Sequence, residues 1–296
     1  SKFVSKKFLS LVKKSMIDHG NHIMNNLEKS FDFSGHNHFM ANVVGLVFLG
    51  ICYESKLSNR WLSYGLKEFI NSIDNQFYED GGNFEGSSYY HRLVFEMVLH
   101  STILINNNLI YIEDSLKNDN IFNNKIINKI MNSFIFYKNI ISPDMRLFQY
   151  GDNDSGKFFD ITSKNEKDIQ KNLIELADHF FSIQSNSKSI STLFINDAVD
   201  RSSFKYNKIN EEYSTLSTRS IFFPESKIYK YFNDNYTALC VLRPVFLGHT
   251  HNDLFSFELS FKDEPIIVDG GSYCYTSNLS LRDKFRNTIN HNTFIK

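Results

Sequence analysis

The chain has few cysteines, no excess of charge of either sign and no long apolar run. Its three cysteines, Cys52, Cys240 and Cys274, are far apart, which indicates neither a disulfide framework nor a CxxC zinc site. Lys plus Arg number 32 and Asp plus Glu number 33, so the basic excess typical of nucleic-acid binders is absent. The longest apolar stretch, 43–53, is shorter than the ~20 residues of a membrane-spanning helix. We expect no nucleic-acid partner and no membrane span.

The remaining composition is that of a globular protein, with 42% hydrophobic and 22% charged residues. Aromatic residues reach 15%, which fits a large core and also fits a sugar-binding cleft. A net charge of -1 is compatible with a locally basic groove for an anionic substrate. The first 16 residues interrupt their apolar positions with lysines, which predicts an amphipathic helix rather than a signal peptide. A chain beginning after a cleaved signal would look the same, so the compartment is not fixed.

The pattern of the chain changes near residue 190. Helical spacing is found at 40–55, 59–77, 88–105, 120–137 and 164–184. Short segments rich in β-branched and aromatic residues follow at 219–226, 228–233, 237–246, 254–261 and 264–271. This order predicts a helical domain over 1–190 and a β-domain over 191–296. Since the strand signal stops without a closing hairpin, we expect further strands beyond it.

Two polar stretches of the helical half are candidates for chemistry. In GHNHFMAN (35–42), Asn37 and His38 precede a buried helix, where they either cap it or present a polar pair to a cleft. In DGGNFEGSSYYHR (80–92), Ser87 or Ser88 suits a helix N-cap. Two tyrosines, His91 and Arg92 follow it. In one interpretation the aromatic rings pack in the core and the arginine is solvated; in the other a tyrosine acts as a base. A tyrosine acting as base needs a neighbour such as His91 or Arg92 to lower its pKa from about 10.

Two further stretches lie beyond residue 147. GDNDSGK (151–157) fits part of a phosphate-binding loop, but Phe158 replaces the Ser or Thr and the aspartates would repel phosphate. We interpret it as an acidic turn that lines a cleft. In GHTHNDLFSFELS (248–260), His249 and His251 share a face if they lie on a strand. Together with Asp269 and His291 they are either separately satisfied polar residues or zinc ligands.

Taken in order, these stretches resemble the heparinase II/III-like polysaccharide lyases, which include alginate and oligoalginate lyases. The most specific parts are GHTHNDLFSFEL, VDGGSYCY and HNT. The resemblance implies an incomplete α/α toroid of helical hairpins, lacking N-terminal helices, followed by an antiparallel β-sandwich with its C-terminal part missing. It also implies a periplasmic or extracellular location and a cleft between the two domains that takes an acidic polysaccharide.

The resemblance also implies roles for individual residues. Asn37 with His38 would neutralise a uronate carboxylate, Tyr90 would be the catalytic tyrosine and His249 the catalytic histidine. Substrate binding would fall to Glu85, His91 and Arg92. Structural zinc would be held by His251, Asp269 and His291. Phe285 stands where some alginate-cleaving relatives use a tyrosine as acid, so that chemistry is not expected here.

β-Elimination fits these roles. Donors at Asn37 and His38 would stabilise the charge that develops when the C5 proton leaves. Tyr90 and His249 would divide the acid and base steps, each worth ~10²–10⁴-fold, and the sequence leaves open which does which. Two other functions remain open: a zinc-assisted glycan hydrolase, and a non-catalytic glycan-binding or assembly protein. The sequence leaves the oligomeric state open too.

Overall fold

The computed structural model describes residues 4–29, 35–116, 121–159, 165–181, 218–245 and 248–295. The helices are α1 (Lys6–Asn25), α2 (Asn37–Cys52), α3 (Lys56–Gln76), α4 (Ser88–Asn107), α5 (Leu109–Leu116), α6 (Asn124–Asn139), α7 (Glu166–Phe180) and α9 (Leu279–Phe285), with a 3₁₀ turn at Thr288–Asn290. The strands are β1 (Thr218–Phe223), β2 (Ile228–Asn233), β3 (Tyr236–Val241), β4 (Phe257–Phe261) and β5 (Glu264–Ile267). The predicted order of helices followed by strands is confirmed. The short helices α5 and α9 are additions to the predicted set.

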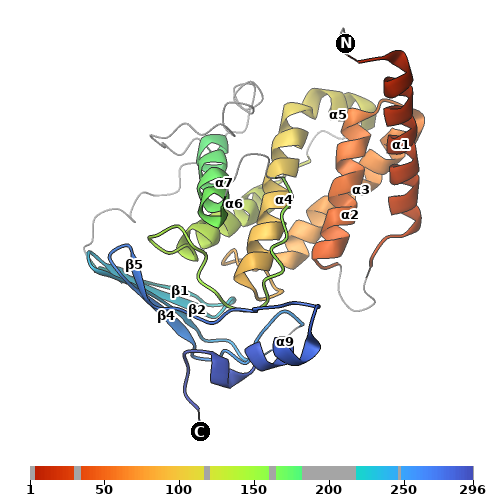
Figure 1. Cartoon of the computed structure of the whole chain (residues 1–296). Helices are drawn as coiled ribbons and strands as arrows, with labels where there is room; N and C mark the ends of the chain where they lie inside the picture. The colour runs from red at the N-terminus through yellow and green to blue at the C-terminus, as the bar shows by residue number, and fades with distance from the viewer. Residues whose placement is uncertain are drawn as a thin grey trace.

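The helices pack as hairpins of sequence neighbours, with α2 against α1, α3 and α4, and α6 against α3 and α4 (Figure 1). α2 is apolar nearly all round and its core-facing residues are buried, as its sequence predicts. Its N-cap is His36, whose ring accepts a hydrogen bond from the His38 backbone N–H, so the predicted cap at Asn37 or His38 is wrong by one residue or more. The N-cap of α4 is Ser87, which confirms one of the two predicted residues.

The five strands form one antiparallel sheet in the order β1-β2-β3-β4-β5. Two-residue turns join β2 to β3 and β4 to β5, whereas β3 and β4 are joined by a long loop that carries His249 and His251. These histidines do not lie on a strand, and the strand predicted from residue 254 begins only at Phe257. The reason is local: Phe255 has a φ of 62°, which is incompatible with an extended strand.

The sheet and the helices share one hydrophobic core. Phe223, Leu239 and Val241 on one face of the sheet belong to the same buried cluster as the helices. The ring of Phe223 contacts that of Phe136 on α6 edge to face, with 4.8 Å between their centroids. The described halves are therefore fixed against each other. The predicted boundary at residues 190 and 191 lies outside the described residues.

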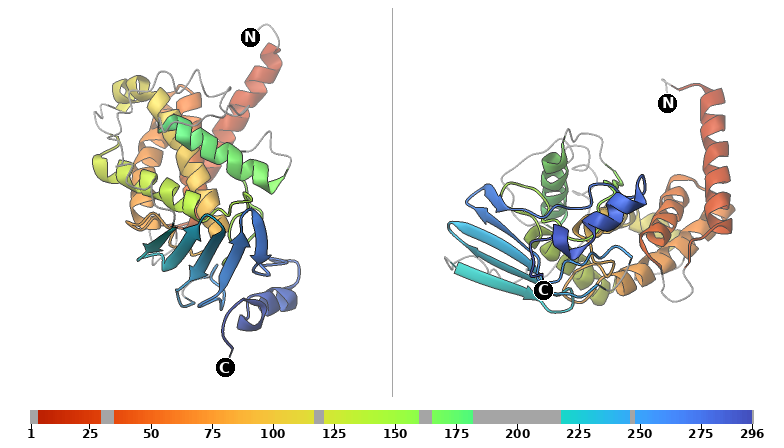
Figure 2. Two further views of the ribbon diagram at one scale, coloured as in Figure 1. Left: turned by 90° about the vertical axis from the view of Figure 1, so that its left-hand side faces the viewer. Right: turned by 60° about the horizontal axis from the view of Figure 1, so that its bottom comes forward.

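Figure 2 shows the helices on one side of the sheet only. Phe222, Tyr236, Phe257 and Phe261 stay exposed on the other side. Over the described ranges the sheet is a single layer, so the antiparallel sheet is confirmed while a facing second sheet is not seen. No helix in the described part of the chain is long and apolar enough to cross a membrane.

A buried histidine makes the stability of this fold dependent on pH. Burial lowers the pKa of His91 to about 3, although a hydrogen bond to the Ser133 carbonyl opposes the change. The unfolded chain takes up this proton below about 6.5 and the folded chain does not, so the stabilisation is lost as the pH falls. Burial of Glu258 raises its pKa to about 7, which acts in the opposite direction.

We therefore predict the effect of His91→Asn as a difference from the wild type. Urea unfolding should show that the wild type exceeds the variant in free energy of unfolding by about 1 kcal/mol less at pH 5.5 than at pH 7. The reason is that only the wild type has the buried ring that resists protonation. His19→Asn, at an exposed position on α1, is the control and should leave the pH dependence unchanged. A wild-type advantage that stays constant between the two pH values would contradict the prediction.

Candidate active site

Three loops from distant parts of the sequence meet at the junction of the helices and the sheet. They are the loop before α4, the loop that follows Phe148, and the loop between β3 and β4. Asp152 donates its backbone N–H to the His249 carbonyl at 2.8 Å, and Ser88 donates to the Tyr150 carbonyl at 3.2 Å. Gly151 has a φ of 67°, and a Cβ there would lie 2.6 Å from the His249 carbonyl oxygen. Only glycine lets the loops approach this closely.

The predicted catalytic pair meets at this junction. The rings of Tyr90 and His249 are stacked, with 3.7 Å between their centroids and 20° between their planes. Tyr90 is in the first turn of α4, and His249 comes from the β3–β4 loop. The Tyr90 hydroxyl donates to Asp154 Oδ2 at 2.9 Å. A phenol from the helical half and an imidazole from the β-half are therefore in contact.

The environment of Tyr90 stabilises the neutral phenol. Burial, the hydroxyl of Tyr275 and the negative charge of Asp154 raise the pKa of Tyr90 well above its usual value of about 10. The expectation that His91 or Arg92 lowers this pKa is wrong, because neither side chain faces the Tyr90 hydroxyl. His91 accepts the Asn83 backbone N–H and contacts the Ser133 carbonyl.

Arg92 is likewise a core residue rather than a solvated or substrate-facing one. Its Nη1 forms a buried ion pair with Glu96 at 3.2 Å, and its Nη2 donates to the Gly156 carbonyl. The same Glu96 accepts the backbone N–H groups of Phe158 and Phe159. His91 and Arg92 are 1% and 2% exposed, so both predicted substrate contacts are corrected to structural roles. They support the loops that carry Glu85 and Asp154.

A buried carboxylate, Asp152, organises the two neighbouring histidines. It accepts from His249 Nδ1 at 3.2 Å and from His251 Nε2 at 2.9 Å. Arg282 and Arg286 approach it at 3.9 and 3.8 Å. Burial alone would raise the pKa of Asp152. The hydrogen bonds from the two histidines and the charge of Arg286 have a larger, opposite effect, so the pKa of Asp152 lies below its usual range. Asp152 is therefore the anion that orients both rings.

Glu85 joins Asn37 to this group. Its carboxylate accepts the Asn37 backbone N–H at 2.6 Å and the Asn37 side-chain amide at 2.8 Å. Its Oε2 lies 3.7 Å from His249 Nε2. Because an asparagine amide has two N–H groups, one is held by Glu85 and the other remains for a ligand.

The two predicted partners before α2 separate in the structure. His38 is exposed and its Nδ1 lies 2.9 Å from Glu28, away from the stacked pair. His36 caps α2 next to Asn37, and its pKa is lowered mainly by burial and by the neighbouring His38. The structure therefore brings Asn37, Glu85, Tyr90 and His249 together and leaves His38 outside the group.

The predicted zinc ligands form a second buried group beside Asp152. The rings of His251 and His291 lie 5.3 Å apart, and His291 Nδ1 is 2.8 Å from Asp269. Two buried ring nitrogens, His251 Nδ1 and His291 Nε2, have no hydrogen-bond partner. Such nitrogens are ligands that zinc takes, so the residue types fit the metal. Across the described ranges, however, no three side chains are arranged as a metal cluster, and Asp269 bonds the opposite nitrogen of His291.

Several residues of the site are absent from the sequence-based set. Asp152 and Asp154 lie in the acidic turn that was interpreted only as a cleft lining. Arg282 lies over the ring of Tyr275 at 5.3 Å, and Arg286 donates to the Gly248 and Thr250 carbonyls on either side of His249. The only sequence signal for these residues was their place in the stretches that carry the family resemblance, because α9 is too short to show periodicity.

Comparison with known proteins identifies the family of the chain. A model of the heparinase II/III N-terminus matches residues 1–185, and a model of the heparinase II/III-like C-terminal domain matches residues 215–295. The chain belongs to the heparinase II/III-like family. No curated protein matches the chain.

Solved structures share the fold of this heparinase II/III-like chain. A structure of heparinase III has a TM-score of 0.72 at 16% identity and covers 98% of this chain and 43% of its own. Heparan sulfate lyase HepC from Pedobacter heparinus has a TM-score of 0.60 at 20% identity and covers 96% of this chain and 40% of its own. The chain thus spans about 40% of the length of these structures. The helical array and antiparallel sheet are those of the heparinase III fold.

The central place of Asp152 predicts a large effect of Asp152→Asn. The substitution keeps the shape but leaves the neighbouring histidines and arginines without their buried anion, so urea unfolding at pH 7 should show a loss of about 2–4 kcal/mol. Asp234→Asn, in the exposed β2–β3 turn, is the control and should change stability by less than about 0.5 kcal/mol. Equal stability of both variants would show that Asp152 is not the organising anion.

Proposed function

We propose that this protein is a polysaccharide lyase that cleaves a uronate-containing glycan by β-elimination. The observation that carries the proposal is the stacked contact between Tyr90 and His249 at the junction of the two halves. Membership of the heparinase II/III-like family supports the same reaction class. The similar structures are of heparinase III and a heparan sulfate lyase, which makes a glycosaminoglycan the first substrate to test.

The reaction needs one proton acceptor and one proton donor. The acceptor takes the C5 proton of the uronate, and the electron pair forms the C4–C5 double bond. The bond from C4 to the glycosidic oxygen breaks, and the donor protonates that oxygen. No water is consumed, and the new non-reducing end is a 4,5-unsaturated uronate.

The resting protonation of the site favours Tyr90 as the donor. Burial, Tyr275 and Asp154 all keep its proton in place near neutral pH. As an acceptor, Tyr90 would have to ionise 2.9 Å from the Asp154 carboxylate, which opposes a second negative charge. His249 is set up as the acceptor: Asp152 bonds its Nδ1 and orients the ring, leaving Nε2 for the C5 proton.

Asn37 supplies the charge stabilisation that elimination requires. The C5 proton is weakly acidic beside an ionised carboxylate, so a donor to that carboxylate lowers the barrier. The Asn37 amide has one N–H held by Glu85 and a second available for the uronate. Glu85 is then a positioning residue that fixes the Asn37 side chain.

In this proposal zinc has a structural role. His251 and His291 would hold it through their unpartnered ring nitrogens, and Asp269 would orient His291 from its other nitrogen. Bound zinc would stiffen the β3–β4 loop two residues from His249. The chemistry itself would stay with Tyr90 and His249.

The first prediction from this proposal concerns Tyr90→Phe. Removing the hydroxyl that protonates the leaving oxygen should slow release of unsaturated uronate by ~10²–10⁴-fold. The release is measured as the ultraviolet absorbance of the product when the full-length protein acts on uronate polysaccharides. Tyr89→Phe is the matched control, because the adjacent Tyr89 hydroxyl donates to Glu166 instead. Full activity of Tyr90→Phe, or equal losses in both variants, would refute the assigned role.

A chelator distinguishes this proposal from a zinc-assisted hydrolase. If zinc is structural, chelation should lower the melting temperature first, and activity should fall slowly as the protein unfolds. Metal analysis of the purified protein gives the metal content before treatment. Immediate loss of turnover in a folded protein, together with a product that lacks the unsaturated end, would instead support hydrolysis.

A further inference from the structure

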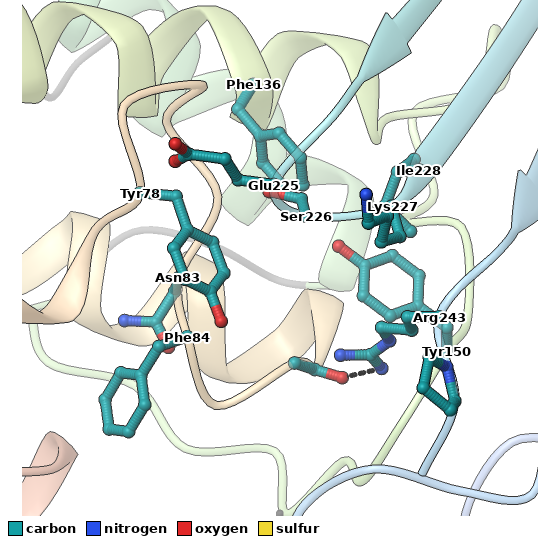
Figure 3. A pocket seen from close by; sticks show the side chains of 12 residues that line it. Tyr78, Asn83, Phe84, Phe136, Tyr150, Glu225, Ser226, Lys227, Ile228 and Arg243 are labelled. Atoms are coloured by element: carbon teal, nitrogen blue, oxygen red, sulfur yellow. Dashed lines mark hydrogen bonds between the residues drawn. The ribbon is translucent and has the colours of Figure 1, made fainter. Parts of the chain in front are cut away.

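A cavity lies close to the stacked pair and takes no part in the proposed chemistry. It has a volume of about 210 Å³ and is lined by residues from the loop before α4, from α6, from the β1–β2 turn and from the segment after β3. Figure 3 shows Tyr78 and Tyr150 with their hydroxyls directed at the same space as the guanidinium of Arg243. The cavity therefore gathers hydrogen-bond donors from three separate parts of the chain.

Arg243 is the main cationic group of this cavity. Its guanidinium carbon lies 5.1 Å from the centre of the Tyr150 ring, and its Nη2 donates to the Gly86 carbonyl. Its Nε is buried and has no hydrogen-bond partner. Among the residues that the structure describes, no carboxylate lies within ion-pair distance of Arg243. Arginine, whose donors match planar oxyanions, thus has donors to spare at this position.

The carboxylates near the cavity are already engaged. Glu225 itself lines the cavity, and its carboxylate accepts the Glu79 backbone N–H at 2.6 Å. Asp80 accepts the backbone N–H groups of Glu225 and Ser226, both at 2.8 Å, and the Ser226 hydroxyl at 2.6 Å. These bonds hold the β1–β2 turn against the helical half. They leave the guanidinium of Arg243 to meet an outside anion.

The cavity adjoins the proposed active site through one residue on each of two loops. A Cβ on Gly86 would lie 1.7 Å from Arg243 Nη1 and 2.8 Å from Thr250 Cγ2. Gly86 follows Glu85 in the chain, and Thr250 follows His249. Glu85 and His249 are both residues of the proposed active site. The cavity therefore lies one residue away, along both loops, from the groups proposed to act on the cleaved bond.

We propose that this cavity is a subsite that binds the oxyanion substituent, carboxylate or sulfate, of an acidic sugar adjacent to the cleaved bond. The subsite rests on the proposed lyase function for its place along the polymer. Arg243 supplies the charge-assisted hydrogen bonds. The hydroxyls of Tyr78 and Tyr150 supply neutral donors.

The test is a set of binding titrations with Arg243→Gln in the full-length protein. All proteins carry Tyr90→Phe so that the probes are not consumed. The probes are a heparan sulfate hexasaccharide, its desulfated form, and its desulfated and carboxyl-reduced form. We expect Arg243→Gln to weaken binding of at least one charged probe by ~10-fold or more, the equivalent of one lost charge-assisted contact, with little change for the neutral probe.

The three probes separate the two oxyanions. Weaker binding of the sulfated probe alone assigns a sulfate to the subsite, and weaker binding of the desulfated probe as well assigns a carboxylate. Lys13→Gln, exposed on α1, is the control for loss of one positive charge and should bind as the parent does. Equal affinity of the Arg243→Gln and parent proteins for every probe, or no binding by the parent, overturns the subsite.

Tyr150→Phe keeps the test decisive if Arg243→Gln unfolds, which its melting temperature would reveal. This change removes one buried hydroxyl of the cavity and should weaken the same charged probe by ~3-fold or more. No weakening by Tyr150→Phe in that case overturns the subsite. Turnover is measured separately, with protein that keeps Tyr90. If that protein forms no unsaturated product, the lyase proposal fails but the subsite does not. If it forms product while binding is unchanged by the cavity variants, the subsite fails but the lyase proposal does not.

Discussion

The proposed active site depends on one buried anion, Asp152. It takes a hydrogen bond from His249 on one oxygen and from His251 on the other. Removing a carboxylate from water is costly, and the two imidazoles with the nearby guanidiniums of Arg282 and Arg286 offset that cost. The carboxylate thus joins the histidine that faces Tyr90 to the histidine of the predicted metal group. The same carboxylate therefore orients the ring of His249 and holds the ring of His251 in place.

Rigid packing explains why the proposed catalytic pair, drawn from two halves of the chain, can be held in register. Phe223 and Leu239 of the sheet lie in the same core as the helices, so the halves have little freedom to slide. Gly151 then allows the three loops to close to van der Waals distance. Arg92 and Glu96 anchor the loop that carries Asp154. These contacts fix the loops that carry Tyr90, Asp154 and His249 relative to one another.

The charges of the site are divided between two sides of the loop before α4. On one side, Asp154 and Tyr275 keep the Tyr90 phenol neutral while Asp152 orients His249. On the other side, Arg243 faces a cavity with unused donors. An acidic polymer would meet a proton donor and acceptor at one sugar and a cation at the next. This arrangement would let recognition of charge on one sugar position the bond of its neighbour.

The order of helices and strands could be read from the hydrophobic period of the sequence. The family could be read from motifs that are contiguous in the chain, and the resemblance to that family implied the pairing of Tyr90 with His249. Tertiary structure alone decided that His36 caps α2, that His91 and Arg92 are buried, and that Asp152, Asp154 and Tyr275 join the site. It also decided that Arg243 lines a cavity next to Glu85. Periodicity reports which face of an element is apolar, whereas the partner of a polar side chain depends on loops brought together from more than 60 residues away.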